Sequence, residues 1–263
     1  MRVLLTNDDG YLARGIHELY KALSDRAEVK VVVPDRERSA TGMGLTLTEP
    51  LRVRDIPLPE LPGKMVNGTP ADCVKMGISY LLQDKQPDFV FSGINHGSNT
   101  GLNALYSGTV AGAVEGAMNG IPSIAVSIAS FQPDDYTVAV RAALNVLDRV
   151  QDFELQPFEL LSVNVPPIPM KDIKGLRVTR VAHVMYREAF DRRIDARNNE
   201  YFWMGGEWVN FGVLPDGDET LLREGYVTVT PLRMDITAEE RLTAMRKAGW
   251  DEEWQAGEQA GGS

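Results

Sequence analysis

Cysteine is nearly absent from this sequence, because Cys73 is the only one among 263 residues. A single chain can therefore form neither an internal disulfide bond nor a metal cage of several thiolates. Free cysteine is among the residue types most often buried, so we expect Cys73 to be a small hydrophobic side chain of the core. The lack of disulfide bonds suits a reducing compartment, and we expect a cytoplasmic location.

Long hydrophobic runs are also missing. The first apolar stretch ends at Leu5 and meets Asp8 and Asp9, far short of the roughly 7 to 15 apolar residues of a signal-peptide core. No other stretch approaches the ~18 apolar residues that a membrane span requires. We therefore expect neither a secretory signal nor contact with a membrane.

Basic residues are fewer than acidic ones. The sequence has 27 Lys and Arg against 37 Asp and Glu, which gives a net charge of −10 and an isoelectric point near 4.9. Affinity for nucleic acid comes largely from Lys and Arg on phosphates, so a nucleic-acid polymer is not an expected partner. A small phosphate ligand is still compatible with this charge, because a metal ion and backbone amides can present positive charge locally.

Strand and helix patterns alternate through the first half of the chain, which is typical of a doubly wound parallel sheet. One helix start is marked by Thr69 as N-cap and Pro70 at the first helical position. Residues 36–64 interrupt the alternation, and we expect short strands there at residues 45–47 and 51–53. The other expected strands are residues 3–5, 29–33, 88–92, 123–127 and 160–165, and the expected helices are residues 16–23, 69–82, 107–118 and 136–150.

A chain of 263 residues with 43% hydrophobic composition can bury one sizeable core. We expect an α/β fold with a Rossmann-like, mostly parallel sheet flanked by helices, in which residues 1–130 form the catalytic core. Residues 131–249 would complete that core and add antiparallel β-structure at residues 201–208 and 226–230. This β-rich extension carries aromatic residues that a small segment cannot bury alone, so we expect it to hold together a homodimer or homotetramer. The acidic, Gly-rich tail of residues 250–263 is expected to be disordered.

The first strand runs directly into Asn7, Asp8, Asp9 and Gly10. Ligands of open α/β sheets bind outside the carboxyl ends of such strands. Adjacent acids before a glycine are often only an exposed turn. Two neighbouring carboxylates nevertheless repel each other unless a cation or a shared proton relieves them. At the end of a buried strand we therefore interpret Asp8 and Asp9 as a divalent-metal site, with Gly10 allowing the sharp turn.

Three further loops follow predicted strands or open a helix at the same edge of the sheet: residues 35–39, 92–99 and 106–109. Their Asn and Ser side chains are neutral oxygen ligands that could complete the shell of a hard cation. An oxygen-only shell favours Mg²⁺, Mn²⁺ or Ca²⁺ over Zn²⁺. The glycines and the free N–H groups expected at Thr109 and Val110 favour a phosphate.

Several of these features also have a plainer interpretation. Residues 92–99 could be only a loop with helix-capping asparagines, and residues 36–38 are typical of a solvated charge patch. His17 and His183 are expected to be structural. His96 lies inside the candidate site, either as a phosphate contact or as a bystander.

Five segments, in this order and spacing, resemble the SurE family of survival proteins, which are metal-dependent nucleotide phosphatases. They are NDDG from Asn7, PDRERSA from Pro34, GTPADCV from Gly68, SGINHGSN from Ser92 and YSGTVAGAVEG from Tyr106. The segment EGYVTVTPLRMDITA is similar to the C-terminal signature of the family, so the resemblance extends to Ala238. NDDG alone is a weak motif, whereas the set is highly specific.

The resemblance implies hydrolysis of nucleoside 5′- and 3′-monophosphates to nucleoside and phosphate, with short polyphosphate as a further substrate. It implies one divalent metal ion per subunit, Mg²⁺ or Mn²⁺, with ligands at Asp8, Asp9, Ser39 and Asn95. Phosphate contacts are implied at Asn7, Ser107, Gly108 and Thr109, to which the position of His96 adds a further expected substrate contact.

Two positions depart from the family pattern. Arg14 stands where the family usually has proline, and residues 215–220 blur a Gly-Thr-Asp motif. Both lie outside the implied ligand set, so they bear on loop shape and subunit contacts.

The mechanism that fits these residues is metal-assisted hydrolysis of a phosphomonoester, with Ser107 and helix-start amides stabilising the phosphoryl oxygens. Asp8 or Asp9 could also act as base or nucleophile, and the sequence does not separate these roles. A haloacid-dehalogenase phosphatase is a competing enzyme class, but Asp8-Asp9-Gly10 lacks the second acid two residues after the first. A non-catalytic nucleotide-binding module is the alternative outside enzymes, and it predicts tight binding without turnover.

Overall fold

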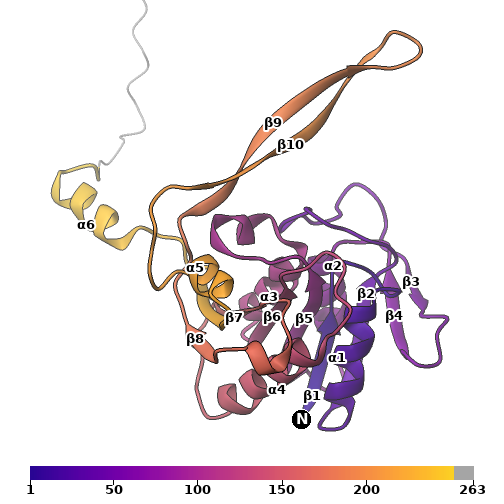
Figure 1. Ribbon diagram of the computed structural model, residues 1–263. Coiled ribbons are helices and arrows are strands. Elements are labelled where there is room, and N and C mark those ends of the chain that lie inside the picture. The colour runs from indigo at the N-terminus through magenta and orange to yellow at the C-terminus, as the bar shows by residue number, and fades with distance from the viewer. Residues whose placement is uncertain (252–263) are drawn as a thin grey trace, which may run out of the picture.

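The computed structural model describes residues 1–251, in which a nine-stranded sheet has the order β3-β4-β2-β1-β5-β6-β7-β11-β8 (Figure 1). The six strands from β4 to β7 in this order are parallel to their neighbours. β3 is antiparallel to β4, β11 is antiparallel to β7, and β8 is parallel to β11. This is the mostly parallel α/β fold that the sequence predicts. Apart from residues 250 and 251, the tail expected to be disordered lies outside the described residues.

The elements alternate along the chain as the sequence pattern indicates. The strands of the main sheet are β1 (Arg2–Thr6), β2 (Glu28–Pro34), β3 (Val53–Asp55), β4 (Gly63–Val66), β5 (Phe89–His96), β6 (Ser123–Ile128), β7 (Glu159–Val165), β8 (Leu176–Val178) and β11 (Val227–Arg233). The helices are α1 (Arg14–Ser24), α2 (Pro70–Met76), α3 (Gly108–Met118), α4 (Thr137–Val150), α5 (Asp218–Arg223) and α6 (Glu239–Lys247).

Helices cover both faces of the sheet because successive side chains of a strand point to opposite faces. In β1, Val3 and Leu5 belong to a buried cluster with residues of α1 and α4, whereas Leu4 belongs to a second cluster with residues of α2. A buried strand of this kind is apolar on both sides, which explains its unbroken apolar run. Cys73 is fully buried in the second cluster, as expected.

The start of α2 confirms the capping signal. The Thr69 hydroxyl accepts a hydrogen bond from Asp72 N at 3.2 Å, and the Asp72 carboxylate accepts one from Thr69 N at 2.9 Å. Such a reciprocal box satisfies two backbone donors that the helix cannot pair itself. The helix is shorter than predicted, because α2 passes into a π-helical turn at Gly77–Leu81.

Two predictions about strands are wrong. Residues 45–47 form no strand, because Thr46 N donates to the Asp72 carboxylate at 3.1 Å instead of pairing with a neighbouring strand. The strand expected at residues 51–53 begins only at Val53, as β3. In addition, β5 continues through His96, so most of the segment expected to be a loop is strand.

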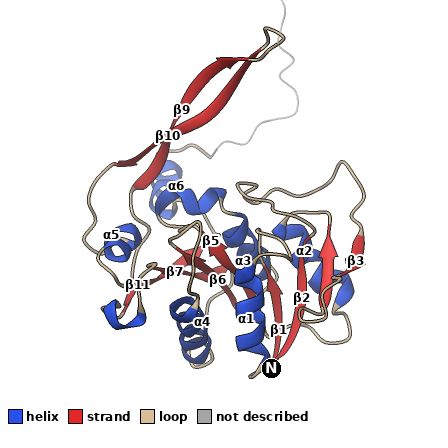
Figure 2. Cartoon of the chain, turned by 45° about the vertical axis from the view of Figure 1, so that its right-hand side comes forward, coloured by secondary structure: helices blue, strands red, loops and turns tan. Residues whose placement is uncertain are grey.

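The second sheet is a hairpin of β9 (Val184–Ile194) and β10 (Glu200–Asn210), which we call the arm. Figures 1 and 2 show it projecting away from the nine-stranded body. The antiparallel structure expected at residues 201–208 is therefore confirmed, whereas β9, α5 and α6 were not predicted. The main sheet takes strands from both sides of residue 130, and the division there stays a prediction. Among residues 1–251, no helix has the length and apolar character that crossing a membrane would need.

Candidate metal and phosphate site

The carboxylates of the NDDG segment lie where the strand order changes direction. β1 pairs with β2 on one side and with β5 on the other, and all three strands are parallel. Their carboxyl ends therefore meet at one edge, which is the usual ligand position in an open α/β sheet. The Asp8 backbone carbonyl accepts a hydrogen bond from Arg38 N at 2.7 Å, so the loop after β2 is tied to this turn.

Asp8 is buried against the start of α3. It is only 4% exposed, and its Oδ1 accepts a hydrogen bond from the hydroxyl of Thr109. A Cβ at Gly108 would lie 2.8 Å from the Asp8 Cβ, closer than side-chain carbons pack, so only glycine fits there without a shift. The turn after β1 and the first turn of α3 are thus fitted to each other.

Asp9 points toward the end of β5. Its Oδ2 accepts a hydrogen bond from His96 N at 3.3 Å and lies 3.9 Å from His96 Nδ1. Burial raises the pKa of Asp8 and of Asp9 to about 6 in each case. The hydrogen bond from Thr109 opposes this rise at Asp8, and the one from His96 opposes it at Asp9. Both carboxylates are thus held in surroundings that disfavour their charge.

Asn95 and Ser39 supply neutral oxygens beside these acids. Asn95 Nδ2 donates to Gly97 O at 2.7 Å, which leaves Oδ1 as the atom with which this amide could bind a cation. The hydroxyl of Ser39, an exposed residue, donates to Glu37 Oε1 at 2.7 Å and keeps its lone pairs for coordination. Asp8, Ser39 and Asn95 all line one cavity of about 750 Å³.

Ser107 lines the same cavity and caps α3. Its Oγ accepts a hydrogen bond from Val110 N at 3.1 Å. The expectation that the N–H of Val110 is free is therefore wrong, because the helix cap uses it. The positive end of the α3 dipole still lies beside Asp8 and favours an anion there.

Asn7 lies beneath the site rather than in the cavity. It is fully buried, and its Nδ2 donates to Gly10 O at 2.9 Å, which closes the sharp turn in which Gly10 has a φ of +85°. Asp9, Gly108 and Thr109 are likewise not among the residues that line the cavity. His17 is structural, as expected, because its Nε2 bonds Tyr11 O at 2.9 Å.

His96, one of the predicted substrate contacts, makes side-chain interactions that the sequence did not indicate. Its Nε2 lies 2.6 Å from the Tyr136 hydroxyl, and the guanidinium of Arg14 lies over the Tyr136 ring, 5.1 Å from its centre. Burial lowers the pKa of His96, although Asp8 opposes this effect. The unusual Arg14 thus contacts the site through Tyr136, a partner that no local pattern indicated.

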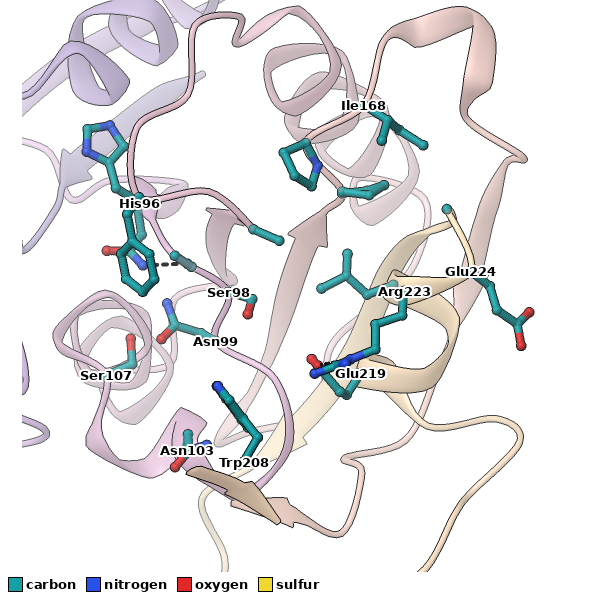
Figure 3. Close-up of a pocket in the computed structure, with 18 of the residues that line it drawn as sticks. His96, Ser98, Asn99, Asn103, Ser107, Ile168, Trp208, Glu219, Arg223 and Glu224 are labelled. Carbon is teal, nitrogen blue, oxygen red and sulfur yellow. Dashed lines mark hydrogen bonds and ion pairs between the residues drawn. The ribbon is translucent and has the colours of Figure 1, made fainter. Parts of the chain in front are cut away.

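Figure 3 shows the cavity between two walls. The wall toward the carboxylates carries His96, Ser98, Asn99 and Ser107, and the opposite wall comes from α5 and the segment after β7. Trp208 of the arm reaches in beside Asn103. The residues of the far wall were not predicted as site residues, because they are distant in sequence from the segments that supply the expected ligands, and the C-terminal signature that begins at Glu224 was given no role in the site. They are Pro166, Pro167, Ile168, Asp172, Lys174, Glu219, Leu222, Arg223, Glu224 and Gly225.

Comparisons with known proteins identify the family and the fold. The model of the family described as "Survival protein SurE" matches residues 3–188. The chain is 46% identical over 255 residues to "5'-nucleotidase SurE" of Synechococcus elongatus, covering 93% of this chain and 98% of that protein. It is 44% identical over 239 residues to the protein of the same name from Heliobacterium modesticaldum, covering 90% and 88% of the two chains. The solved structure "Crystal Structure of Sure Protein from Aquifex aeolicus" matches with a TM-score of 0.81 and 36% identity over 95% of this chain and 100% of that one.

Proposed function

This chain belongs to the SurE family, and we propose that it is a metal-dependent phosphomonoesterase that hydrolyses nucleoside 5′- and 3′-monophosphates, with short polyphosphate as a further substrate. The name "5'-nucleotidase SurE" of its relatives supports the nucleotide substrate. The observation that carries the proposal is the pair of acids Asp8 and Asp9 at the switch point of the sheet, beside neutral oxygens and the start of α3.

The donor set fits a hard divalent cation. The carboxylates of Asp8 and Asp9, the Ser39 hydroxyl and the Asn95 amide oxygen would hold Mg²⁺ or Mn²⁺ without any nitrogen or sulfur ligand. Within residues 1–251, no Lys or Arg side chain lies within ion-pair distance of Asp8, so a cation would relieve a charge that burial disfavours. When bound, such an ion supplies a Lewis acid for a phosphoryl oxygen and lowers the pKa of a coordinated water.

The residues of this chain would then place the phosphate. Ser107 and the first turn of α3 would contact its oxygens, where charge grows in the transition state. Thr109 fixes the orientation of Asp8 through its hydroxyl. The volume of about 750 Å³ lies within the usual range for a small-molecule site and leaves room beyond the phosphate for a nucleoside.

Phosphate release from AMP, with Mn²⁺ or Mg²⁺ and with excess EDTA, tests the proposal. We expect repeated turnover with metal, loss of turnover in EDTA, and recovery when metal is added back in excess. The alternative, a non-catalytic nucleotide-binding module, requires that AMP binds at the same metal concentration without any phosphate release. Undiminished turnover in EDTA would instead contradict the role of the metal.

We also propose that the chain forms a homodimer or homotetramer through the arm. Phe190 is directly opposite Met204 in the hairpin register, and alternation places Ile194 and Phe202 on the same face. All four side chains are more than half exposed in one chain, between 54% and 68%. Four large, exposed apolar side chains that surround the Arg192–Glu200 ion pair on one face of a projecting hairpin are typical of an interface.

Light scattering at micromolar concentration tests this assembly. We expect an oligomer for the unmodified chain and a shift toward monomer for Phe190→Glu, because a charge would be placed in the apolar face. Phe153→Glu is the matched control, since Phe153 is 65% exposed on the body near the end of α4 and should leave the assembly intact. A monomeric wild-type protein with full activity would refute the proposal.

A further inference from the structure

The cavity is larger than a phosphate requires, and its wall beyond the carboxylates combines charged side chains with an apolar surface. Pro166, Pro167, Ile168 and Leu222 line it there, together with the indole of Trp208. A charged phosphate group gains nothing from contact with an apolar surface. A flat, weakly polar group attached to the phosphate would be stabilised there, because its burial removes apolar area from water.

Trp208 enters this part of the cavity from β10 (Figure 3). It is directly opposite Tyr186 in the hairpin register. The two rings pack edge to face, with 6.2 Å between the ring centroids and an angle of 80° between the ring planes. Tyr186 N also donates to Asn103 Oδ1 at 3.2 Å, in the 3₁₀ segment Gly101–Tyr106 that leads into Ser107. The base of the arm is thus fixed to the wall that carries the candidate phosphate contact.

The indole is held at one edge but is not enclosed. Trp208 as a residue remains 43% exposed and lines the cavity, so its side chain is accessible to a ligand there. An aromatic ring that is fixed in place and open on a face is what base stacking requires, since every base presents a π-face.

The other aromatic side chains that line the cavity are placed differently. The imidazole of His96 is bonded to the Tyr136 hydroxyl through Nε2, and its Nδ1 lies 3.9 Å from Asp9 Oδ2 at the carboxylate end. Tyr106 also lines the cavity and is 60% exposed, but it directly precedes Ser107 on the wall toward the carboxylates. Phe131 lies over Gly97, where an added Cβ would be 3.0 Å from its ring, and is 85% exposed. Trp208 is therefore the aromatic ring of the cavity that comes from the arm, and it lies beside the apolar surface of the far wall.

We propose that Trp208 is the specificity-determining residue of this site and that its indole stacks on the nucleobase of the substrate. The inference rests on the function proposed above and extends it, because it assigns the recognition of the base to a residue of the arm. An indole can stack on any base, but the stacking energy increases with the area of the base. Purine monophosphates should therefore be better substrates than pyrimidine monophosphates.

The test compares AMP with ribose 5-phosphate, which has the same phosphate and sugar but no base. For Trp208→Ala we expect the ratio of kcat/KM for AMP to that for ribose 5-phosphate to fall about tenfold, mainly through KM for AMP. Trp208→Phe retains an aromatic face and should restore most of the ratio.

Trp203→Ala is the matched control. Trp203 lies on the same strand but, by alternation, on the opposite face from Trp208, and it does not line the cavity. Its removal should leave the ratio unchanged. Light scattering on the Trp208 variants would verify that their assembly is that of the wild type.

The outcomes separate this inference from the proposed function. If Trp208→Ala lowers kcat/KM equally for both substrates, or if Trp203→Ala changes the ratio as much, the stacking role is wrong while the enzyme assignment stands. If the wild type releases phosphate from neither substrate, the proposed function is wrong. Calorimetric dissociation constants of AMP for wild type and Trp208→Ala then decide the stacking role, and equal constants would overturn it.

Discussion

Replacing Asp8 by asparagine is expected to lower the metal-dependent turnover of AMP by about a thousandfold, more than the ten- to hundredfold typical of residues that only support a metal ligand. The change removes one of the two negative charges at the metal site while keeping the shape of a side chain that is only 4% exposed. It also changes the partner of the Thr109 hydroxyl. Asp9→Asn should behave similarly, because it removes the other charge.

Steady-state phosphate release at saturating metal measures this loss, and circular dichroism would verify that the fold survives. Asp25→Asn is the control, since Asp25 is an exposed aspartate that caps the end of α1 away from the site. It should retain wild-type activity. Wild-type turnover by Asp8→Asn or by Asp9→Asn would rule out the proposed metal site.

The same Asp8 variant should be more stable than the wild type when metal is absent. Burial raises the pKa of Asp8 to about 6 in the folded protein, above its ordinary value of 3.8. The folded state therefore binds more protons than the unfolded state between these two values, and the free energy of unfolding falls as pH rises through this window. Asparagine has no proton to lose, so this component of the pH dependence should disappear.

Urea unfolding in EDTA measures the effect. At pH 7 we expect Asp8→Asn to exceed the wild type by roughly 1 to 3 kcal/mol, since one pKa unit corresponds to about 1.4 kcal/mol. The difference should shrink toward pH 4, where the wild-type carboxyl is protonated in the folded state. A metal-free wild type that is more stable than the variant at pH 7 would contradict the account of the buried charge.

The sequence predicts the carboxylate end of the site because its signals are local. β1 and the NDDG turn are contiguous, and α3 begins with its own cap at Ser107. Parallel strands bring such loops to one edge whatever their separation in sequence, so Asp8, Ser39 and Asn95 could be placed together before their contacts were known.

The course of β5 could not be predicted in the same way. Gly93 and Asn95 are residues typical of turns, and Gly93 does adopt a φ of +137°. The strand nevertheless continues, because β6 pairs with it again at Asn95 and His96 after a shift of register. Whether a turn-forming residue ends a strand depends here on the neighbouring strand, which the local sequence does not contain.

The far part of the cavity is the portion that sequence reasoning missed. His96 meets Tyr136 across 40 positions, and Trp208 lines one cavity with residues of α5 and of the segment after β7 only because the arm leaves the body there. Their residue types are ordinary for packing, so nothing in the local pattern separates them from core residues. Their contribution becomes visible only when the cavity is seen as a whole (Figure 3).

The second large effect that we expect is a preference for phosphate monoesters over phosphate diesters. A terminal phosphate carries up to two negative charges, whereas the phosphate of a diester carries one, and the proposed site offers one metal ion and one helix start. The whole protein has a net charge of −10, which disfavours the binding of a longer polyanion. We therefore expect the enzyme to discriminate by the charge of the phosphate rather than by nucleotide sequence.

The most direct measurement is kcat/KM for AMP, for a matched adenine dinucleotide and for a simple aryl phosphate at equal free metal. We expect AMP to exceed the dinucleotide by at least about a hundredfold, because only the monoester has a doubly charged group for the metal and helix start. We expect AMP also to exceed the aryl phosphate. An aryl phosphate that is much the best substrate would refute the nucleotide part alone, and a dinucleotide cleaved as efficiently as AMP would contradict the phosphomonoesterase itself.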